Sequence, residues 1–145
     1  MTVDLPDWAF GVGVIPRHAL RPTQSPYFAV ITPIVEANSH ARFYVEDGYA
    51  KEKPWVPIGK RFSIWYVLCT TLPNAASALV IEVESQDNPG SYTALAGAKG
   101  YERIEFPGGV LFDFEANTRP IYHIYNFGNM NRQFVITIFG IEESV

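Results

Sequence analysis

Residues 109–142, GVLFDFEANTRPIYHIYNFGNMNRQFVITIFGIE, decide the fold of this chain. They contain three runs rich in β-branched and aromatic residues, namely Val110–Glu115, Pro120–Phe127 and Arg132–Phe139. The joints between these runs are rich in Asn and Gly, which tolerate the backbone geometry of tight turns. The last run carries apolar side chains on both of its faces, which is typical of a strand covered on both sides. The stretch therefore predicts three consecutive β-strands inside a sandwich.

Similar runs recur from Tyr27 onward and alternate with turn residues. The predicted strands are Tyr27–Thr32, Ala41–Glu46, Arg61–Thr71, Ala78–Glu84 and Tyr101–Phe106. Residues Tyr92–Ala98 fit either a short strand or a single helical turn. The sequence shows no amphipathic helix, internal repeat or interdomain linker. We therefore expect an all-β fold of eight or nine strands, with residues 27–145 forming one antiparallel β-sandwich of the jelly-roll or Greek-key kind.

Residues 1–26 differ from the rest because proline recurs through them. Proline has no amide proton to donate, so this segment cannot be a central strand. We expect an extended Pro-rich N-terminal arm or edge segment, in which Trp8–Ile15 could form one short edge strand. Its aromatic side chains, Trp8 and Phe10, must be buried somewhere. Two arrangements remain open: the arm lies on a neighbouring subunit, or it wraps over its own sandwich.

The composition places limits on the partners of this chain. With 145 residues, 48% of them hydrophobic and 18% charged, the chain has the size and composition of one folded domain. The net charge is −4 and the basic residues are scattered, so we expect no direct binding to nucleic acid. The sequence shows neither a signal peptide nor an apolar run long enough to span a bilayer, so we expect no membrane contact and synthesis in a cytoplasm.

The candidate metal ligands do not form a recognisable pattern. His18, His40 and His123 are far apart and none has a second ligand type at a known spacing. His123 lies within a predicted strand, where we expect a satisfied structural imidazole. The Asp87–Asn88 turn lacks the dense oxygen ligands of a calcium site. The single cysteine, Cys69, is expected to be a buried core thiol, and we expect no metal and no cofactor.

The sequence also lacks a catalytic pattern. In the strand 78–84 the apolar residues are expected to point inward, while Glu82 and Glu84 point outward. Asp113 and Glu115 form a second pair with the same spacing. Such pairs are typical of a solvated strand surface, and catalysis by paired carboxylates would need two groups across a cleft. There is no Gly-x-Ser-x-Gly motif, so we expect no catalytic residues and no enzymatic activity.

Aromatic residues are the remaining candidates for binding. Trp55 lies between Pro54 and Pro57 in a predicted loop and is the best candidate for an exposed ring. Rings of this kind can anchor a protein interface or stack on a sugar, whereas Trp65 is expected to fill the core. The partner-binding residues predicted from the sequence are Trp8, Phe10, Tyr44, Tyr49 and Trp55.

The chain resembles the small β-sandwich accessory proteins of tailed bacteriophage virions, such as capsid decoration and tail-associated proteins. The similarity rests on the Pro-rich opening Asp4–Trp8, the all-β body, the single cysteine and the closing strand Val135–Glu142. It implies a non-enzymatic structural protein that binds capsid or tail protein as a homo-oligomer, commonly a trimer. It also implies a place in the virion, after synthesis in the host cytoplasm.

Two other functions compete with this one. A carbohydrate-binding module would use Trp55 with Tyr44 or Tyr49 as a stacking platform, and its partner would be a saccharide. A sandwich lyase or cupin-like enzyme would need a cluster of histidines, which the sequence lacks.

Overall fold

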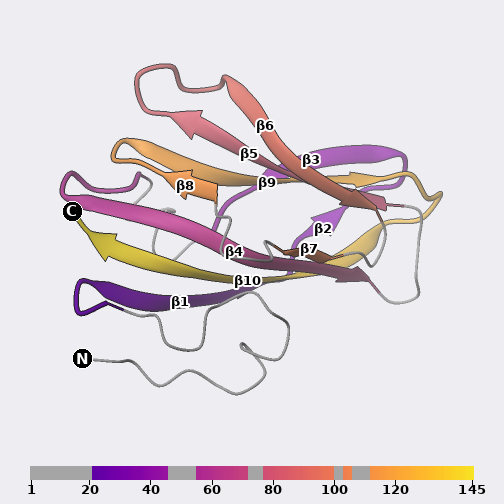
Figure 1. Ribbon diagram of the computed structural model, residues 1–145. Coiled ribbons are helices and arrows are strands. Elements are labelled where there is room, and N and C mark those ends of the chain that lie inside the picture. The colour runs from indigo at the N-terminus through magenta and orange to yellow at the C-terminus, as the bar shows by residue number, and fades with distance from the viewer. Residues whose placement is uncertain (1–20, 46–54, 72–76, 100–102, 106–111) are drawn as a thin grey trace.

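The computed structural model describes residues 21–45, 55–71, 77–99, 103–105 and 112–145, and these form two antiparallel sheets packed as a sandwich (Figure 1). They contain nine strands of three residues or more, a two-residue strand and no helix. The predicted all-β antiparallel sandwich is confirmed. Residues 1–20, which hold most of the expected arm, lie outside the described ranges. No membrane-spanning helix occurs in the part of the chain that is described.

The first sheet has six strands, and four of them follow the order β1-β10-β4-β7. β2 also pairs with β10, and β8 also pairs with β4. The strands are β1 (Gln24–Ile31), β2 (Ile34–Val35), β4 (Lys60–Thr71), β7 (Arg103–Glu105), β8 (Phe112–Phe114) and β10 (Arg132–Ser144). β10 continues to Ser144, so it extends beyond the strand Arg132–Phe139 that the sequence predicts. β1 begins at Gln24, so the end of the expected arm belongs to an edge strand.

The second sheet has four strands in the order β3-β9-β5-β6. These strands are β3 (Ser39–Phe43), β5 (Ser77–Ser85), β6 (Tyr92–Lys99) and β9 (Thr118–Asn126). The segment predicted as either strand or helical turn is therefore the strand β6. The three strands predicted at 110–139 are divided between the sheets, because β8 and β10 lie in the first sheet and β9 in the second (Figure 1).

The core lies between the facing sides of the two sheets. Its largest fully buried side chains include Phe62, Phe134 and Tyr122. Cys69 is buried in this core, as the sequence predicts. Trp65 is buried too, but it does not belong to the core cluster. Pairing between β10 and β4 shifts between Phe139 and Gly140, so Trp65 is the residue of β4 that the shift leaves without a direct partner.

Gly140 marks the point where β10 changes its register with β4. A methyl group added at Gly140 would collide with the carbonyl oxygen of Ser63 and would meet the Phe62 ring at 3.1 Å. The backbones of the two strands therefore approach more closely here than any residue with a side chain allows.

Candidate functional site

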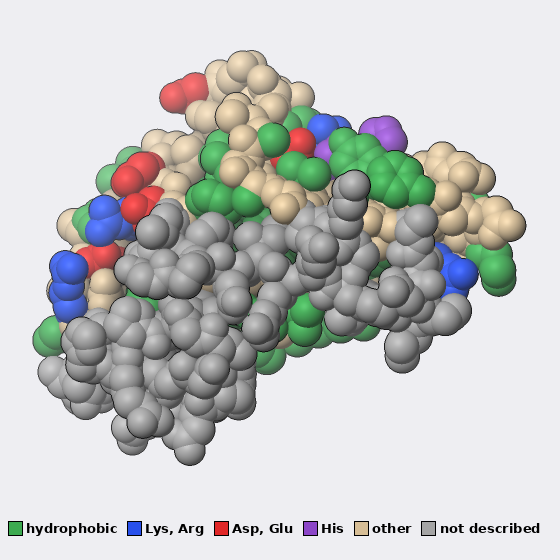
Figure 2. Space-filling model, turned by 45° about the vertical axis from the view of Figure 1, so that its right-hand side comes forward, with side chains coloured by type: hydrophobic (Ala, Val, Ile, Leu, Met, Phe, Trp, Pro, Cys, Tyr) green, Lys and Arg blue, Asp and Glu red, His purple; other side chains and the backbone are tan. Residues whose placement is uncertain are grey.

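The outer face of the four-stranded sheet combines charged, imidazole and aromatic side chains. Figure 2 shows hydrophobic side chains gathered beside the histidines on this upper surface. The pairing of β3 with β9 places His40 opposite Tyr125, and Arg42 opposite His123. Paired residues share a sheet face, so these four side chains lie together. We take this face as the first candidate functional site.

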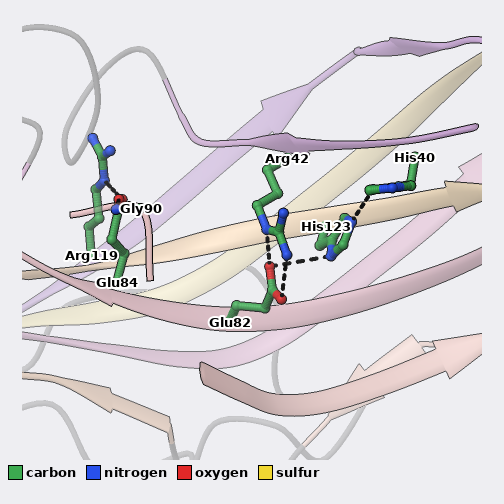
Figure 3. A network of polar contacts seen from close by, with 7 residues as sticks. All are labelled: His40, Arg42, Glu82, Glu84, Gly90, Arg119 and His123. Atoms are coloured by element: carbon green, nitrogen blue, oxygen red, sulfur yellow. Dashed lines mark hydrogen bonds and ion pairs between the residues drawn. The ribbon is translucent and has the colours of Figure 1, made fainter. Parts of the chain in front are cut away.

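Glu82 is held at the centre of this face by Arg42 (Figure 3). The Arg42 Nε donates to Glu82 Oε1 at 2.9 Å and Nη2 donates to Oε2 at 3.4 Å. Only 6% of Glu82 is exposed, although its sequence pattern predicts a solvated side chain. That prediction was wrong, because the guanidinium covers the carboxylate that the strand turns outward. The hydrogen bond to Glu82 raises the pKa of Arg42, so the guanidinium stays charged.

Glu84 has a similar environment two residues further along β5. The Arg119 Nε donates to Glu84 Oε1 at 2.7 Å, and the Gly90 amide donates to Oε2 at 2.8 Å (Figure 3). Glu84 is 3% exposed, so it also departs from the predicted solvated surface. The predicted alternation itself is correct, since Leu79 and Ile81 enter the core. Both carboxylates are engaged by arginine, which makes them structural ion pairs and not a solvent-facing acid and base.

The two histidines on this face are in direct contact. Nδ1 of His40 and Nε2 of His123 are 2.8 Å apart, and Nδ1 of His123 lies 3.4 Å from Glu82 Oε1. His123 is buried, but its Nδ1 forms no hydrogen bond within the described residues, so the imidazole is not the fully satisfied one that the sequence predicts, whereas His40 is exposed. Burial, together with the positive charge of Arg42, lowers the pKa of His123. The ring of Tyr125 packs on both imidazoles, with centroids 4.3 Å from His123 and 5.3 Å from His40.

Two of the predicted partner-binding residues meet at Arg119. The guanidinium carbon lies 4.4 Å from the Tyr44 ring centroid and 4.2 Å from that of Trp55. These distances are typical of cation–π contacts. Tyr44 is 41% exposed, whereas Trp55 is only partly exposed. The other predicted partner-binding residues, Trp8, Phe10 and Tyr49, lie outside the described residues.

The remaining acidic candidates lie apart from this site. Asp113 accepts a hydrogen bond from the Ser63 hydroxyl at 2.6 Å, and both Asp113 and Glu115 are exposed. Asp87 lies in an exposed turn, where its amide donates to the Ser85 hydroxyl at 3.3 Å. Among the described residues, no group of three or more His, Cys, Asp or Glu is arranged to hold a metal ion.

The outer face of the six-stranded sheet is a second candidate site, with a different chemistry. Strand pairing sets Val30 opposite Thr137 and Ile34 opposite Gln133, all on the face turned away from the core. The apolar outer face comprises four exposed side chains on neighbouring strands: Phe28, Val30, Ile34 and Val135. Ile34 is 65% exposed and Phe28 is 55% exposed, and they lie at the two ends of this row, with Val30 and Val135 between them.

A hollow of about 380 Å³ lies between the end of β1 and the end of β3. It is lined by residues 30–33, at the end of β1, and by residues 43–45, at the end of β3. β1 is the edge of one sheet and β3 is the edge of the other, so the hollow lies along the open side of the sandwich. It adjoins Val30 of the apolar outer face and Tyr44 of the cation–π group.

No protein-family model matches this sequence, and no curated protein sequence matches it. Among solved structures, the mitogen derived from Yersinia pseudotuberculosis (YPM) is similar, with a TM-score of 0.55. The alignment covers 79% of this chain and 86% of the mitogen, at 10% sequence identity. At this identity the similarity supports the β-sandwich fold and carries no information about function.

Proposed function

We propose that this protein is a non-enzymatic structural protein that acts by binding other protein subunits, in the manner of the decoration or tail-associated proteins of tailed phage virions. The observation that carries the proposal is the apolar outer face of the six-stranded sheet. Contiguous exposed apolar side chains cost free energy in water and mark interaction surfaces. Phe28 and Val30 on β1, beside Val135 on β10, supply such a surface without any catalytic geometry.

The partner proposed is a second copy of this chain, with a trimer as the favoured assembly, as well as the capsid or tail surface. This part of the proposal rests on the sequence resemblance to virion accessory proteins. Strands of a sandwich bury one face in the core, so an apolar residue that stays exposed on the opposite face buries only part of its area on folding. The area that stays exposed gains free energy when another surface covers it, at roughly 25 cal/mol per Å² of apolar area.

Sedimentation velocity over a wide concentration range tests the proposal. We expect the full chain to form an oligomer, and Val30→Lys and Val135→Lys to shift it to the monomer. Ile58→Lys is the matched control, because Ile58 is 84% exposed but lies in the loop before β4. Val30→Lys and Val135→Lys variants that keep the oligomer contradict an interface at this face, and a monomeric wild-type protein contradicts the homo-oligomer.

The N-terminal segment is tested separately by deleting residues 1–20. The deletion leaves β1 and every other described strand intact, so the sandwich should fold. If the arm joins subunits, the truncated protein loses its oligomer while keeping its cooperative unfolding transition. A truncated protein that still assembles contradicts the role of the arm but leaves the apolar outer face as the interface.

A carbohydrate-binding function is the second candidate, and the arrangement of Tyr44 and Trp55 around Arg119 supports it. Rings held by a fixed cation are already ordered, which reduces the entropy lost on stacking against a sugar. A glycan panel with wild-type protein, Trp55→Ala and Tyr44→Ala tests this candidate. Loss of a specific saccharide signal in both variants supports it, and no binding by the wild-type protein contradicts it. Thermal unfolding must accompany the panel, because both rings also contact Arg119.

A further inference from the structure

Two imidazole nitrogens meet on the outer face of the four-stranded sheet. Nδ1 of His40 and Nε2 of His123 are 2.8 Å apart (Figure 3). His123 is fixed within the buried part of β9, whereas His40 is exposed on the edge strand β3. A hydrogen bond between two neutral imidazoles needs an N–H on one ring and a lone pair on the other. The contacts of the two rings decide which ring supplies the lone pair.

The contact of Glu82 with the other nitrogen of His123 assigns the tautomer of this ring. That nitrogen, Nδ1, is buried, forms no hydrogen bond within the described residues and lies 3.4 Å from Glu82 Oε1. An ionised carboxylate only accepts hydrogen bonds, so the proton of neutral His123 resides on Nδ1, where it faces Glu82. The Nε2 lone pair of His123 then points toward His40. Carboxylate–imidazole pairs of this kind orient the histidine ligands of many metal centres.

The separation of the two nitrogens limits the geometry of any ion that joins them. Metal–imidazole bonds are about 2.0 Å long, so two nitrogens 2.8 Å apart subtend an angle of about 90° at the ion. This is the angle between neighbouring ligands in a square-planar or octahedral complex. A tetrahedral ion would need the nitrogens about 3.3 Å apart. The pair therefore suits Cu²⁺ or Ni²⁺ better than Zn²⁺.

We propose that His40 and His123 form a surface binding site for Cu²⁺, and more weakly for Ni²⁺, with Glu82 as the positioning residue. The ion replaces the hydrogen bond between the two rings and lies to one side of the line that joins the two nitrogens. The exposed ring of His40 turns its Nδ1 lone pair to the ion, and its proton moves to Nε2 through solvent. No third His, Cys, Asp or Glu within the described residues completes the site, so water fills the remaining coordination positions.

Titration of the purified full chain with Cu²⁺ against a competing chelator tests the site. We expect one ion per chain, and an affinity at least tenfold lower for His40→Ala. His40 is exposed, so this variant should fold like the wild-type protein. His18→Ala is the matched control, because it removes the third histidine of the chain and should leave the affinity unchanged. Equal Cu²⁺ affinity for wild-type protein and His40→Ala overturns the proposal.

Two spectroscopic measurements separate a true site from adventitious binding. Electron paramagnetic resonance of the Cu²⁺ complex should show coupling to two imidazole nitrogens, and coupling to fewer than two overturns the two-histidine site. In the metal-free protein, two-bond ¹H–¹⁵N spectra should show the His123 proton on Nδ1, and Glu82→Gln should disturb this tautomer and weaken Cu²⁺ binding about tenfold. A His123 proton on Nε2 overturns the role of Glu82. Tighter binding of Zn²⁺ than of Ni²⁺ overturns the geometric argument.

Discussion

Arg119 on β9 and Glu84 on β5 are direct cross-strand partners, and 2.7 Å separates Arg119 Nε from Glu84 Oε1. The side chain of Glu84 is 3% exposed and that of Arg119 is 14% exposed, so this ion pair is largely removed from water. The guanidinium also packs on the rings of Tyr44 and Trp55. One side chain thus neutralises a buried carboxylate and orders two aromatic rings.

Arg119→Met should therefore lower the free energy of unfolding by about 3 kcal/mol, because it leaves the buried Glu84 carboxylate without its cation. Urea denaturation measures the change. Lys60→Met is the matched control, since Lys60 forms a 3.6 Å ion pair with Glu142 and both side chains are more than a third exposed. The loss of unfolding free energy in Lys60→Met should be below about 1 kcal/mol. Adding Glu84→Gln to Arg119→Met should recover part of the stability, and a further loss contradicts this account.

Stability should fall as the pH drops below about 6.5, because burial and the Arg42 charge lower the pKa of His123 from its ordinary value of 6.5. The unfolded chain then binds more protons than the folded protein, so protonation favours unfolding. Urea denaturation between pH 7.5 and 5.5 measures the slope of the unfolding free energy against pH. It should be smaller in His123→Gln, and equal slopes contradict the prediction. The range stays above the titration of Glu143, whose pKa the Arg61 hydrogen bond lowers from 4.5.

Gly140→Ala should destabilise the protein by about 3 kcal/mol, because the new methyl group would collide with the backbone carbonyl of Ser63. A backbone atom within a paired strand cannot move aside without breaking the sheet. Gly97→Ala on β6 is the matched control, since its methyl group would lie 3.4 Å from the Leu79 carbonyl oxygen, an ordinary contact. Thermal unfolding compares the two variants, and an equal loss in both contradicts the close approach of β10 and β4.

Cys69 should be unreactive in the folded protein. Burial raises the pKa of its thiol to about 11, so almost no thiolate is present at pH 8. A thiol-specific chromogenic reagent should therefore label Cys69 only in urea, with a labelling rate that follows global unfolding. Rapid and complete labelling without denaturant would show that the core opens locally around β4.

The strands can be predicted from the sequence because each strand carries its own local pattern. The alternation in β5 predicts that Leu79 and Ile81 face the core, and the structure confirms it. The apolar run around Cys69 likewise predicts a buried thiol. The first prediction depends on which side of one strand a residue occupies, which is set by the period of two along the chain, and the second depends on the apolar composition of one strand.

The environment of the outward residues depends on strand order and register, which no local pattern contains. Glu82 and Arg42 are 40 positions apart, and His40 and His123 are 83 positions apart. Glutamates two residues apart on one strand face look the same in sequence whether water or arginine covers them. A prediction of the polar network would have needed the order β3-β9-β5 and the pairing of Arg42 with His123.

The Arg42–Glu82 pair joins two strands that are not neighbours, because β9 lies between β3 and β5. An edge strand usually frays first, since only one neighbour holds it. Here the separation of β3 would leave the buried charge of Glu82 on β5 without its arginine. Fraying of the edge strand therefore costs free energy at β5 as well. A slip of β3 by one residue would turn Arg42 toward the core. We therefore expect the pair to make β3, β9 and β5 open together and to hold them in one register.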